Sequence, residues 1–258
     1  MPRPVAFVTG AGSGIGRATA EGLARAGYDL GLFDLESDSL FEVRDLIYST
    51  GATSIAIPGD VSIDDDVLAA AQRMREHFGR VDAVVANAGI NGVWAPIDDL
   101  TPAEWDRTIN VNLRGTYLTL HNMIPLLKES SGGAIVIVSS INGVRTFSNP
   151  GATAYSATKA AQVAIAQQLA LELGKHGIRI NVVCPGAIET NIETSTEVRH
   201  RAEAEVPVIW PQGSVPITGG EPGRASDVAD AILFLLGSDA KHITGSPIFI
   251  DGGQGLLR

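Results

Sequence analysis

The chain has 258 residues, of which 45% are hydrophobic and 19% charged, and a formal net charge of −10. Its acidic charge is scattered and argues against a nucleic-acid partner, because phosphates would be repelled. Cys184 is the only cysteine, which excludes an intramolecular disulfide. No run reads as a signal peptide or approaches the roughly eighteen apolar residues of a membrane span, so we expect a cytoplasmic protein.

Apolar runs of strand length alternate with helical patterns along the whole chain. Strands are predicted at residues 5–8, 29–33, 53–57, 81–85, 134–138, 178–183 and 248–250. Helices are predicted at residues 17–26, 37–49, 62–78, 101–128, 155–172 and from 226 onward. This alternation without a break in composition predicts an α/β fold in one domain over residues 1–258, with about seven strands in a doubly wound parallel sheet and helices on both faces.

Capping signals mark three of the predicted helix starts. Thr101, a following proline and Glu104 combine an N-cap hydroxyl, a favoured first helical residue and a glutamate three residues after the cap. Ser62 is expected to begin a variant capping box, and Ser226 is expected to cap the last helix. The long helix that starts at Thr101 is expected to continue through Pro125 with a kink.

A glycine-rich loop, TGAGSGIG at residues 9–16, joins the first strand to the first helix. Its backbone N–H groups can approach a pyrophosphate, and the helix N-terminus adds the positive end of a dipole. Asp34 ends the next strand, eighteen residues beyond Gly16, where a carboxylate would accept hydrogen bonds from an adenosine ribose. Together these features predict a Rossmann-type dinucleotide site.

Tyr155 and Lys159 are four residues apart and therefore share one face of a predicted helix. A phenol has an ordinary pKa of about 10, and a nearby ammonium favours the tyrosinate. Such a phenol could exchange a proton with an alcohol or carbonyl while a cofactor exchanges hydride. The pair alone is weak evidence, but the helix follows a strand that ends in Ser139 and Ser140, in a chain that begins with a dinucleotide loop.

The motifs, taken together and in order, resemble those of the short-chain dehydrogenase/reductase family over nearly the whole chain. The matching positions are Thr9-Gly10-x-x-x-Gly14-x-Gly16, Asp60, Asn87-Ala88-Gly89, Asn112-Leu113-x-Gly115, Ser139-Ser140, Tyr155-x-x-x-Lys159 and Pro185-Gly186-x-x-x-Thr190. The resemblance implies a catalytic set of Asn112, Ser140, Tyr155 and Lys159. Tyr155 would be the general acid/base, Lys159 would lower its pKa and hold the nicotinamide ribose, Ser140 would bind the substrate oxygen, and Asn112 would support a water relay.

The cofactor-binding residues that follow from the loop and the resemblance are Gly10, Ser13, Gly14, Ile15, Gly16, Asp34, Leu35, Asp60, Val61, Asn87, Ala88, Gly89, Tyr155, Lys159, Pro185, Gly186, Ile188 and Thr190. We expect NAD as the cofactor. A carboxylate at Asp34 would repel a 2′-phosphate by roughly 4 kcal/mol at about 4 Å and an effective dielectric of 20. Neither Leu35 nor Ser13 supplies a compensating cation. The five histidines show no ligand spacing, so no catalytic metal is predicted.

Two positions depart from the family pattern. Ala86 precedes Asn87, where the family often has a second asparagine. The separation from Ser140 to Tyr155 is fifteen residues, whereas thirteen is common in the family. The intervening loop is therefore longer, and Ser139 remains the alternative catalytic serine.

The substrate side is less well defined by the sequence. Residues 190–223 show no clear periodicity and are predicted to form a substrate lid, with a flexible surface insertion as the alternative. Candidate substrate-binding residues are Ser140, Asn142, Tyr155, Trp94, Glu189 and Trp210, with Arg145, Phe147 and Asn191 in the same loops. Because they mix hydrogen-bonding groups with aromatic faces, a polyol or sugar-like secondary alcohol is favoured.

Three alternatives stay open. The first is an NADP-dependent 3-oxoacyl or other carbonyl reductase, and the second is a non-catalytic dinucleotide-binding redox sensor. The third is an epimerase or dehydratase acting on a nucleotide sugar, although such enzymes usually need a larger substrate domain. The resemblance also implies a homotetramer with 222 symmetry.

Overall fold

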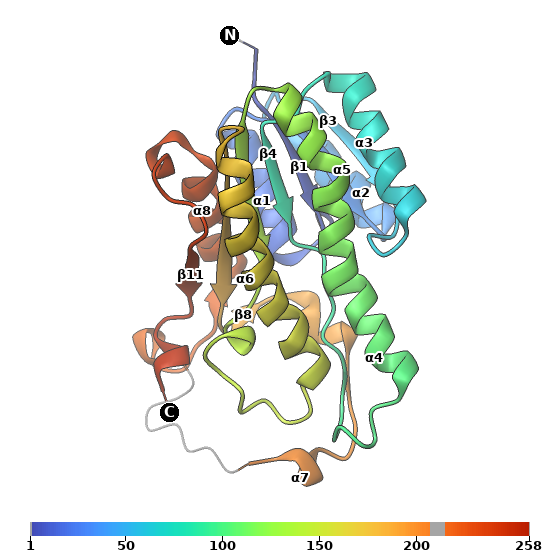
Figure 1. Ribbon diagram of the computed structural model, residues 1–258, viewed down its shortest axis with the longest axis vertical. Helices are drawn as coiled ribbons and strands as arrows, with labels where there is room; N and C mark the ends of the chain where they lie inside the picture. Colours follow the sequence, from blue (N-terminus) through green and yellow to red (C-terminus); the bar gives the residue numbers. More distant parts are fainter. Residues whose placement is uncertain (1, 207–214, 258) are drawn as a thin grey trace.

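A central sheet of seven parallel strands carries the fold (Figure 1). The computed structural model describes residues 2–206 and 215–257. The strands occur in the order β11-β7-β6-β4-β1-β2-β3. Their bounds are β1 Val5–Thr9, β2 Asp29–Asp34, β3 Ser54–Pro58, β4 Ala83–Ala86, β6 Gly133–Val138, β7 Ile178–Pro185 and β11 Pro247–Ile250. The predicted α/β fold with a Rossmann-type parallel sheet is confirmed.

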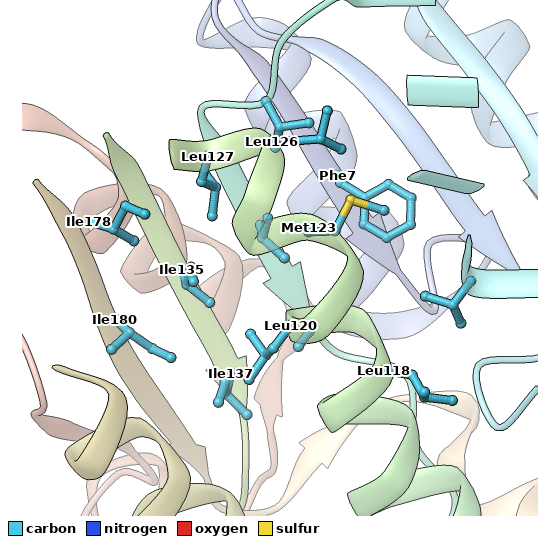
Figure 2. Close-up of a cluster of buried hydrophobic side chains, with 14 of the residues drawn as sticks. Phe7, Leu118, Leu120, Met123, Leu126, Leu127, Ile135, Ile137, Ile178 and Ile180 are labelled. Atoms are coloured by element: carbon cyan, nitrogen blue, oxygen red, sulfur yellow. The ribbon is translucent and has the colours of Figure 1, made fainter. Parts of the chain in front are cut away.

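Helices cover both faces of this sheet, because alternate residues of each strand point to opposite sides. On β1, Phe7 belongs to one apolar cluster, while Val8 belongs to the other. The first cluster is covered by α3 Asp64–Phe78, α5 Gly115–Glu129 and α6 Thr153–Gly174, and the second by α1 Gly14–Arg25, α2 Ser37–Tyr48 and α8 Ala225–Leu236. Figure 2 shows Leu120 and Met123 of α5 together with Phe7, Ile135 and Ile137 of the strands in the first cluster.

The long helix predicted from Thr101 is interrupted. It consists of α4 Pro102–Ile109, a π-helical turn at Asn110–Arg114, and α5, which continues through Pro125. The capping prediction at its start is confirmed: Glu104 N donates to Thr101 Oγ1 (3.3 Å), and Thr101 N donates to Glu104 Oε2 (2.9 Å). The π turn was not predicted, because side-chain bonds from distant residues hold it, as described below.

The other two capping predictions are wrong. Helix α3 begins at Asp64 with Ile63 at its N-cap. The Ser62 hydroxyl instead donates to Asp60 Oδ1 (2.7 Å), so it is used in the turn that precedes the helix. Helix α8 has Arg224 at its N-cap, and Ser226 lies inside the first turn.

Two small parallel sheets lie apart from the central one and were not predicted. They pair β5 Gly92–Trp94 with β9 Thr196–Val198, and β8 Ile188–Glu189 with β10 Gly223–Arg224. The segment predicted as a lid thus contains ordered pieces, among them α7 Arg201–Ala204. Short 3-10 turns complete the chain at Ile141–Gly143, Asn191–Ser195, Pro216–Thr218, Ser238–Ala240 and Gln254–Leu256. Within residues 2–206 and 215–257, no helix has the length and apolarity that crossing a membrane requires.

Candidate active site

A cleft opens at the carboxyl ends of β1, β4, β6 and β7, where ligands of doubly wound sheets bind. The residues that line it come from segments far apart in the sequence: Ile15, Asn87, Gly89, Val138, Ser139, Ser140, Tyr155, Lys159, Pro185, Gly186, Ile188, Thr190 and Ile192. Nine of the predicted cofactor-binding residues are in this lining: Ile15, Asn87, Gly89, Tyr155, Lys159, Pro185, Gly186, Ile188 and Thr190. Val138 and Ile192 line the cleft without having been predicted.

The glycine loop is packed so closely that Gly10, Gly12 and Gly16 leave no room for a side chain. A Cβ atom on Gly16 would lie 1.9 Å from the Gly10 carbonyl oxygen. Asn87 Nδ2 donates to the carbonyls of Thr9 (2.9 Å) and Gly10 (3.2 Å), which ties the loop to the end of β4. Ser13, the N-cap of α1, makes no side-chain capping bond. The loop therefore presents first-turn N–H groups to an anion, and the residues fit a dinucleotide pyrophosphate.

Asp34 lies at the edge of this loop, and its contact with an adenosine ribose stays a prediction. Its Oδ2 accepts a hydrogen bond from Gly12 N (2.8 Å), and its Oδ1 accepts one from Glu36 N (3.2 Å). A Cβ atom on Gly12 would lie 3.1 Å from Asp34 Oδ2, so the carboxylate is held against the glycine loop. Leu35 is exposed beside it. The placement fits a carboxylate that faces an adenosine ribose.

Asp60 and Val61 follow β3 farther along the same edge. Asp60 Oδ1 accepts hydrogen bonds from Ser62 N (2.8 Å) and Ser62 Oγ (2.7 Å). Val61 is buried, and a Cβ atom on Gly115 would lie 1.9 Å from its Cγ2. The glycine of the Asn112-Leu113-x-Gly115 motif thus allows α5 to approach the turn that carries Asp60 and Val61.

Tyr155 and Lys159 are both buried on α6. Burial raises the pKa of Tyr155, while a side-chain hydrogen bond with Ser140 acts to lower it. Burial lowers the pKa of Lys159 to about 8. Lys159 Nζ donates to the Val138 carbonyl (2.9 Å) and lies 5.5 Å from the centre of the Tyr155 ring. Burial and the Ser140 hydrogen bond account for the shift of the Tyr155 pKa. The lowering of that pKa by Lys159 stays a prediction.

The structure separates the two candidate serines. The Ser139 hydroxyl donates to the Lys159 carbonyl (2.7 Å) and is thereby bound to α6. Ser140 accepts a hydrogen bond from Asn142 N (3.2 Å) and interacts with the Tyr155 side chain. These contacts favour Ser140 as the serine that shares a substrate oxygen with Tyr155, and its catalytic role stays a prediction.

Asn112 is fully buried in the π-helical turn. Its Oδ1 accepts from Ile90 N (2.8 Å), and its Nδ2 donates to Ile90 O (2.9 Å) and Thr158 Oγ1 (3.2 Å). Its carbonyl accepts from Thr116 Oγ1 (2.7 Å) and Gln162 Nε2 (3.0 Å). Asn112 thus joins the end of β4 to α6, and its part in a water relay stays a prediction. Gln162 is a missed residue of this region, because a glutamine in an alanine-rich helix gives no distinctive signal.

Comparisons with known proteins agree with this geometry. A family model described as enoyl-(acyl carrier protein) reductase matches residues 10–254. Levodione reductase from Leifsonia aquatica is 35% identical over 254 residues, which cover 97% of this chain and 93% of that protein. Cyclohexanol dehydrogenase from Acinetobacter is 34% identical and covered to 93%, with 96% of this chain matched. The chain belongs to the short-chain dehydrogenase/reductase family.

A solved structure extends the comparison. A crystal structure described as a 3-ketoacyl-ACP reductase from Sinorhizobium meliloti has 61% sequence identity to this chain and a TM-score of 0.95. The match covers 99% of this chain and 100% of that one. The chain is therefore an oxidoreductase of a family that acts on alcohols and ketones.

The predicted substrate residues of this family member fall into two groups. Trp94 on β5 lies close to Tyr155, with the two ring centres 6.4 Å apart. Asn142 is buried at 6% exposure, away from the cleft lining, and Glu189 is exposed on β8. Trp210 lies outside the described residues. Trp94 lies beside Tyr155, and Asn142 contacts Ser140 through its backbone N–H (3.2 Å). Glu189 is exposed and does not line the cleft.

The neighbouring loop residues are also engaged elsewhere. Arg145 lies 3.8 Å from Asp251 Oδ2, and its guanidinium is 3.3 Å from the centre of the Phe249 ring. Phe147 is exposed. Cys184 is fully buried, and burial raises the pKa of its thiol to about 11, which makes it a poor nucleophile. Among residues 2–206 and 215–257, no three His, Cys, Asp or Glu side chains gather as metal ligands.

Proposed function

We propose that the protein is an NAD-dependent oxidoreductase that transfers hydride between a secondary alcohol and its ketone. The observation that carries the proposal is the position of Tyr155. Its side chain lies beside Ser140, with Lys159 one helical turn further on, in a cleft bordered by the tightly packed glycine loop. This arrangement brings a proton-transfer group to the place where a bound dinucleotide would present its nicotinamide.

Each side chain has a distinct part in the proposal. The dinucleotide, when bound, supplies or accepts the hydride. The Tyr155 hydroxyl gives its proton to the carbonyl oxygen during reduction and takes it back during oxidation. The Ser140 hydroxyl donates a hydrogen bond to the same oxygen. Lys159, whose pKa of about 8 leaves most of it charged at pH 7, stabilises the developing tyrosinate and holds the nicotinamide ribose.

The choice of NAD rests on Asp34. Two backbone N–H groups, of Gly12 and Glu36, hold its carboxylate at the loop edge, where it would oppose a ribose 2′-phosphate. A 2′-hydroxyl can donate a hydrogen bond to the same carboxylate. NADP therefore needs a cation that this edge does not supply, since Leu35 follows the acid.

The substrate preference changes when the side chains are placed. The polyol hypothesis rested on hydrogen-bonding and aromatic side chains in these loops, and its polar members Asn142, Arg145, Glu189 and Asn191 do not line the cleft. Val138 and Ile192, which are not assigned to the cofactor, do line it, and Trp94 lies beside Tyr155. Apolar walls of this kind favour a compact, mostly apolar ketone over a polyol. The similarity to levodione reductase and cyclohexanol dehydrogenase supports a cyclic ketone or alcohol.

One assay tests these points together. Absorbance at 340 nm is followed with NAD and NADP, each offered with cyclic alcohols, polyols and sugars, and hydroxy acids. The reverse reaction is followed with NADH and NADPH, each offered with cyclic ketones and 3-oxoacyl thioesters. We expect turnover of cyclic alcohols with NAD, abolished in Tyr155→Phe. Turnover of polyols alone would overturn the substrate assignment, and a Tyr155→Phe variant with full activity would overturn the mechanism.

A 3-oxoacyl reductase is the second candidate. It is favoured by the 61% identity to the Sinorhizobium meliloti protein described as a 3-ketoacyl-ACP reductase. Preferential NADPH oxidation with 3-oxoacyl thioesters would identify this activity. Tight NAD binding without any turnover would leave two interpretations, a substrate outside the panel or the redox sensor. A homotetramer, a cytoplasmic location and a substrate lid at residues 190–223 belong to the same proposal, and sedimentation analysis tests the first of them.

A further inference from the structure

Arg199 joins two segments that are about a hundred residues apart in the sequence. It follows β9, at the end of the molecule that carries α4 and α7 (Figure 1). Its Nε donates to Asp99 Oδ2 (2.7 Å), and its Nη2 donates to the Asp99 carbonyl (2.8 Å). Its Nη1 and Nη2 donate to the two carboxylate oxygens of Glu104 (2.9 and 3.0 Å). The guanidinium thus donates hydrogen bonds to two carboxylates and a carbonyl at once, and a third carboxylate, that of Glu197, lies 3.7 Å from Nη1.

Backbone and hydroxyl contacts continue this attachment along β9. Arg199 N donates to the Trp94 carbonyl (2.9 Å), which extends the pairing of β5 with β9. At the other end, Asn91 N donates to Ser195 Oγ (3.1 Å) and Asn91 Nδ2 donates to Thr196 Oγ1 (2.8 Å). Residues 195–199 are therefore bound at both ends to the segment that leads from β4 to α4.

The carboxylates of Asp99 and Glu104 stay ionised near neutral pH. The hydrogen bond with Arg199, followed by that with Thr101, lowers the pKa of Glu104 to about 2. Contact with Arg199 also lowers the pKa of Asp99. Because Glu104 caps α4 through Thr101, it is already fixed when Arg199 meets it. Isolated surface ion pairs contribute little, but a bidentate network on a fixed carboxylate is the exception.

Strand β5, to which residues 195–199 are bound, lies next to Tyr155. Trp94 is the last residue of β5, and its Nε1 donates to the Asn91 carbonyl (3.2 Å). Its ring centre lies 6.4 Å from that of Tyr155. We propose that Arg199 is a positioning residue. It holds residues 195–199 against β5, a contact that we call the clamp, and thereby keeps Trp94 in place as an aromatic wall beside Tyr155.

The catalytic consequence rests on the proposed function, whereas the clamp itself does not. A fixed wall makes the same contact with the substrate before and during hydride transfer. Losing it weakens ground-state and transition-state binding alike, which raises KM and leaves kcat nearly unchanged. Trp94 is thus a specificity determinant that acts through its position, and Arg199 acts through Trp94.

Hydrogen exchange measured by mass spectrometry tests the clamp without any substrate. Arg199→Met keeps most of the side-chain length but removes all five donors. We expect exchange at residues 92–94 and 196–200 to become at least tenfold faster, with no change in the central strands. Arg75→Met is the matched control, since Arg75 forms a bidentate pair with Glu129 (2.6 and 3.0 Å) between α3 and α5. It should leave both segments unchanged.

Kinetics with the best substrate of the panel test the consequence. We expect Arg199→Met to raise KM about tenfold and to change kcat less than threefold, with partial recovery in Arg199→Lys, which cannot bind both carboxylates as a fork. Glu104→Gln keeps an acceptor for the helix cap and should reproduce part of the Arg199→Met effect. Unchanged exchange in Arg199→Met would overturn the clamp. Faster exchange with an unchanged KM would overturn the role of the wall, and loss of all turnover in every variant and the parent would count against the proposed function alone.

Discussion

Replacing Lys159 with methionine should abolish turnover and yet stabilise the fold at neutral pH. Lys159 is only 3% exposed, and burial lowers its pKa from the ordinary 10.5 to about 8. At roughly 1.4 kcal/mol per pKa unit, the buried ammonium costs the folded state about 3 kcal/mol. Methionine removes this cost, but it also removes the hydrogen bond from Lys159 Nζ to the Val138 carbonyl (2.9 Å). The lost hydrogen bond destabilises the variant by about 1 to 2 kcal/mol. The net expectation is a stabilisation of about 1 kcal/mol or more.

The pH dependence gives the test its sign. Because the folded-state pKa of Lys159 lies below the ordinary value, the unfolded chain holds more protons between about pH 8 and 10.5. The stability of the parent protein therefore rises with pH in that window, and the penalty is fully present below pH 8. Lys159→Met lacks this contribution, so its advantage should be largest at pH 7 and shrink toward pH 10.

Urea unfolding at fixed protein concentration, at pH 7 and pH 10, measures the effect. Lys175→Met is the matched control, because Lys175 is exposed just after the same helix, and it should change stability by less than about 0.5 kcal/mol at either pH. A Lys159→Met variant that is less stable than the parent at both pH values would refute the reasoning. So would an advantage that does not depend on pH.

Three further outcomes follow from particular contacts. Asp34→Asn removes the charge at the loop edge while keeping one acceptor for Gly12 N, and it should raise NADP affinity at least tenfold by calorimetry; unchanged affinity would count against the electrostatic argument. Ser140→Ala should lower kcat by about a hundredfold. Ser139→Ala should retain turnover and lose about 1 kcal/mol of stability, because the hydrogen bond from Ser139 to the Lys159 carbonyl is lost. The reverse pattern would assign the catalytic role to Ser139. Thr101→Ala should cost about 1 kcal/mol in urea unfolding, and no loss would contradict the observed cap.

The parts of the fold that depend on local patterns could be predicted from the sequence. The apolar runs of β1, β4, β6 and β7 are buried on both faces, so their composition alone marks them as central parallel strands. Tyr155 and Lys159 follow from helical spacing, and Asp34 follows from its distance to the glycine loop. Each of these signals lies within about thirty residues of chain.

The parts that depend on distant contacts could not. The pairing of β5 with β9 joins Gly92 to Thr196, and three-residue strands have no periodicity of their own. The polyol hypothesis was weakened for a related reason: composition placed Asn142 and Arg145 in the right loop, but only the packing shows Asn142 buried and Arg145 against Phe249. The choice of Ser140 over Ser139 likewise depends on which hydroxyl α6 engages.

The π-helical turn at Asn112 shows that a motif can be found in a sequence although the shape of the helix that carries it cannot. The Asn112 carbonyl oxygen accepts hydrogen bonds from two side chains, Thr116 Oγ1 and Gln162 Nε2. Thr158, Lys159 and Gln162 form a buried polar seam on α6, in which Gln162 Oε1 finds no hydrogen-bond partner among the described residues. Such a seam costs stability compared with apolar packing. The seam connects α6, which carries Tyr155, to the π-helical turn, whose Asn112 binds Ile90. The cost in stability therefore falls where the proposed reaction needs fixed side chains.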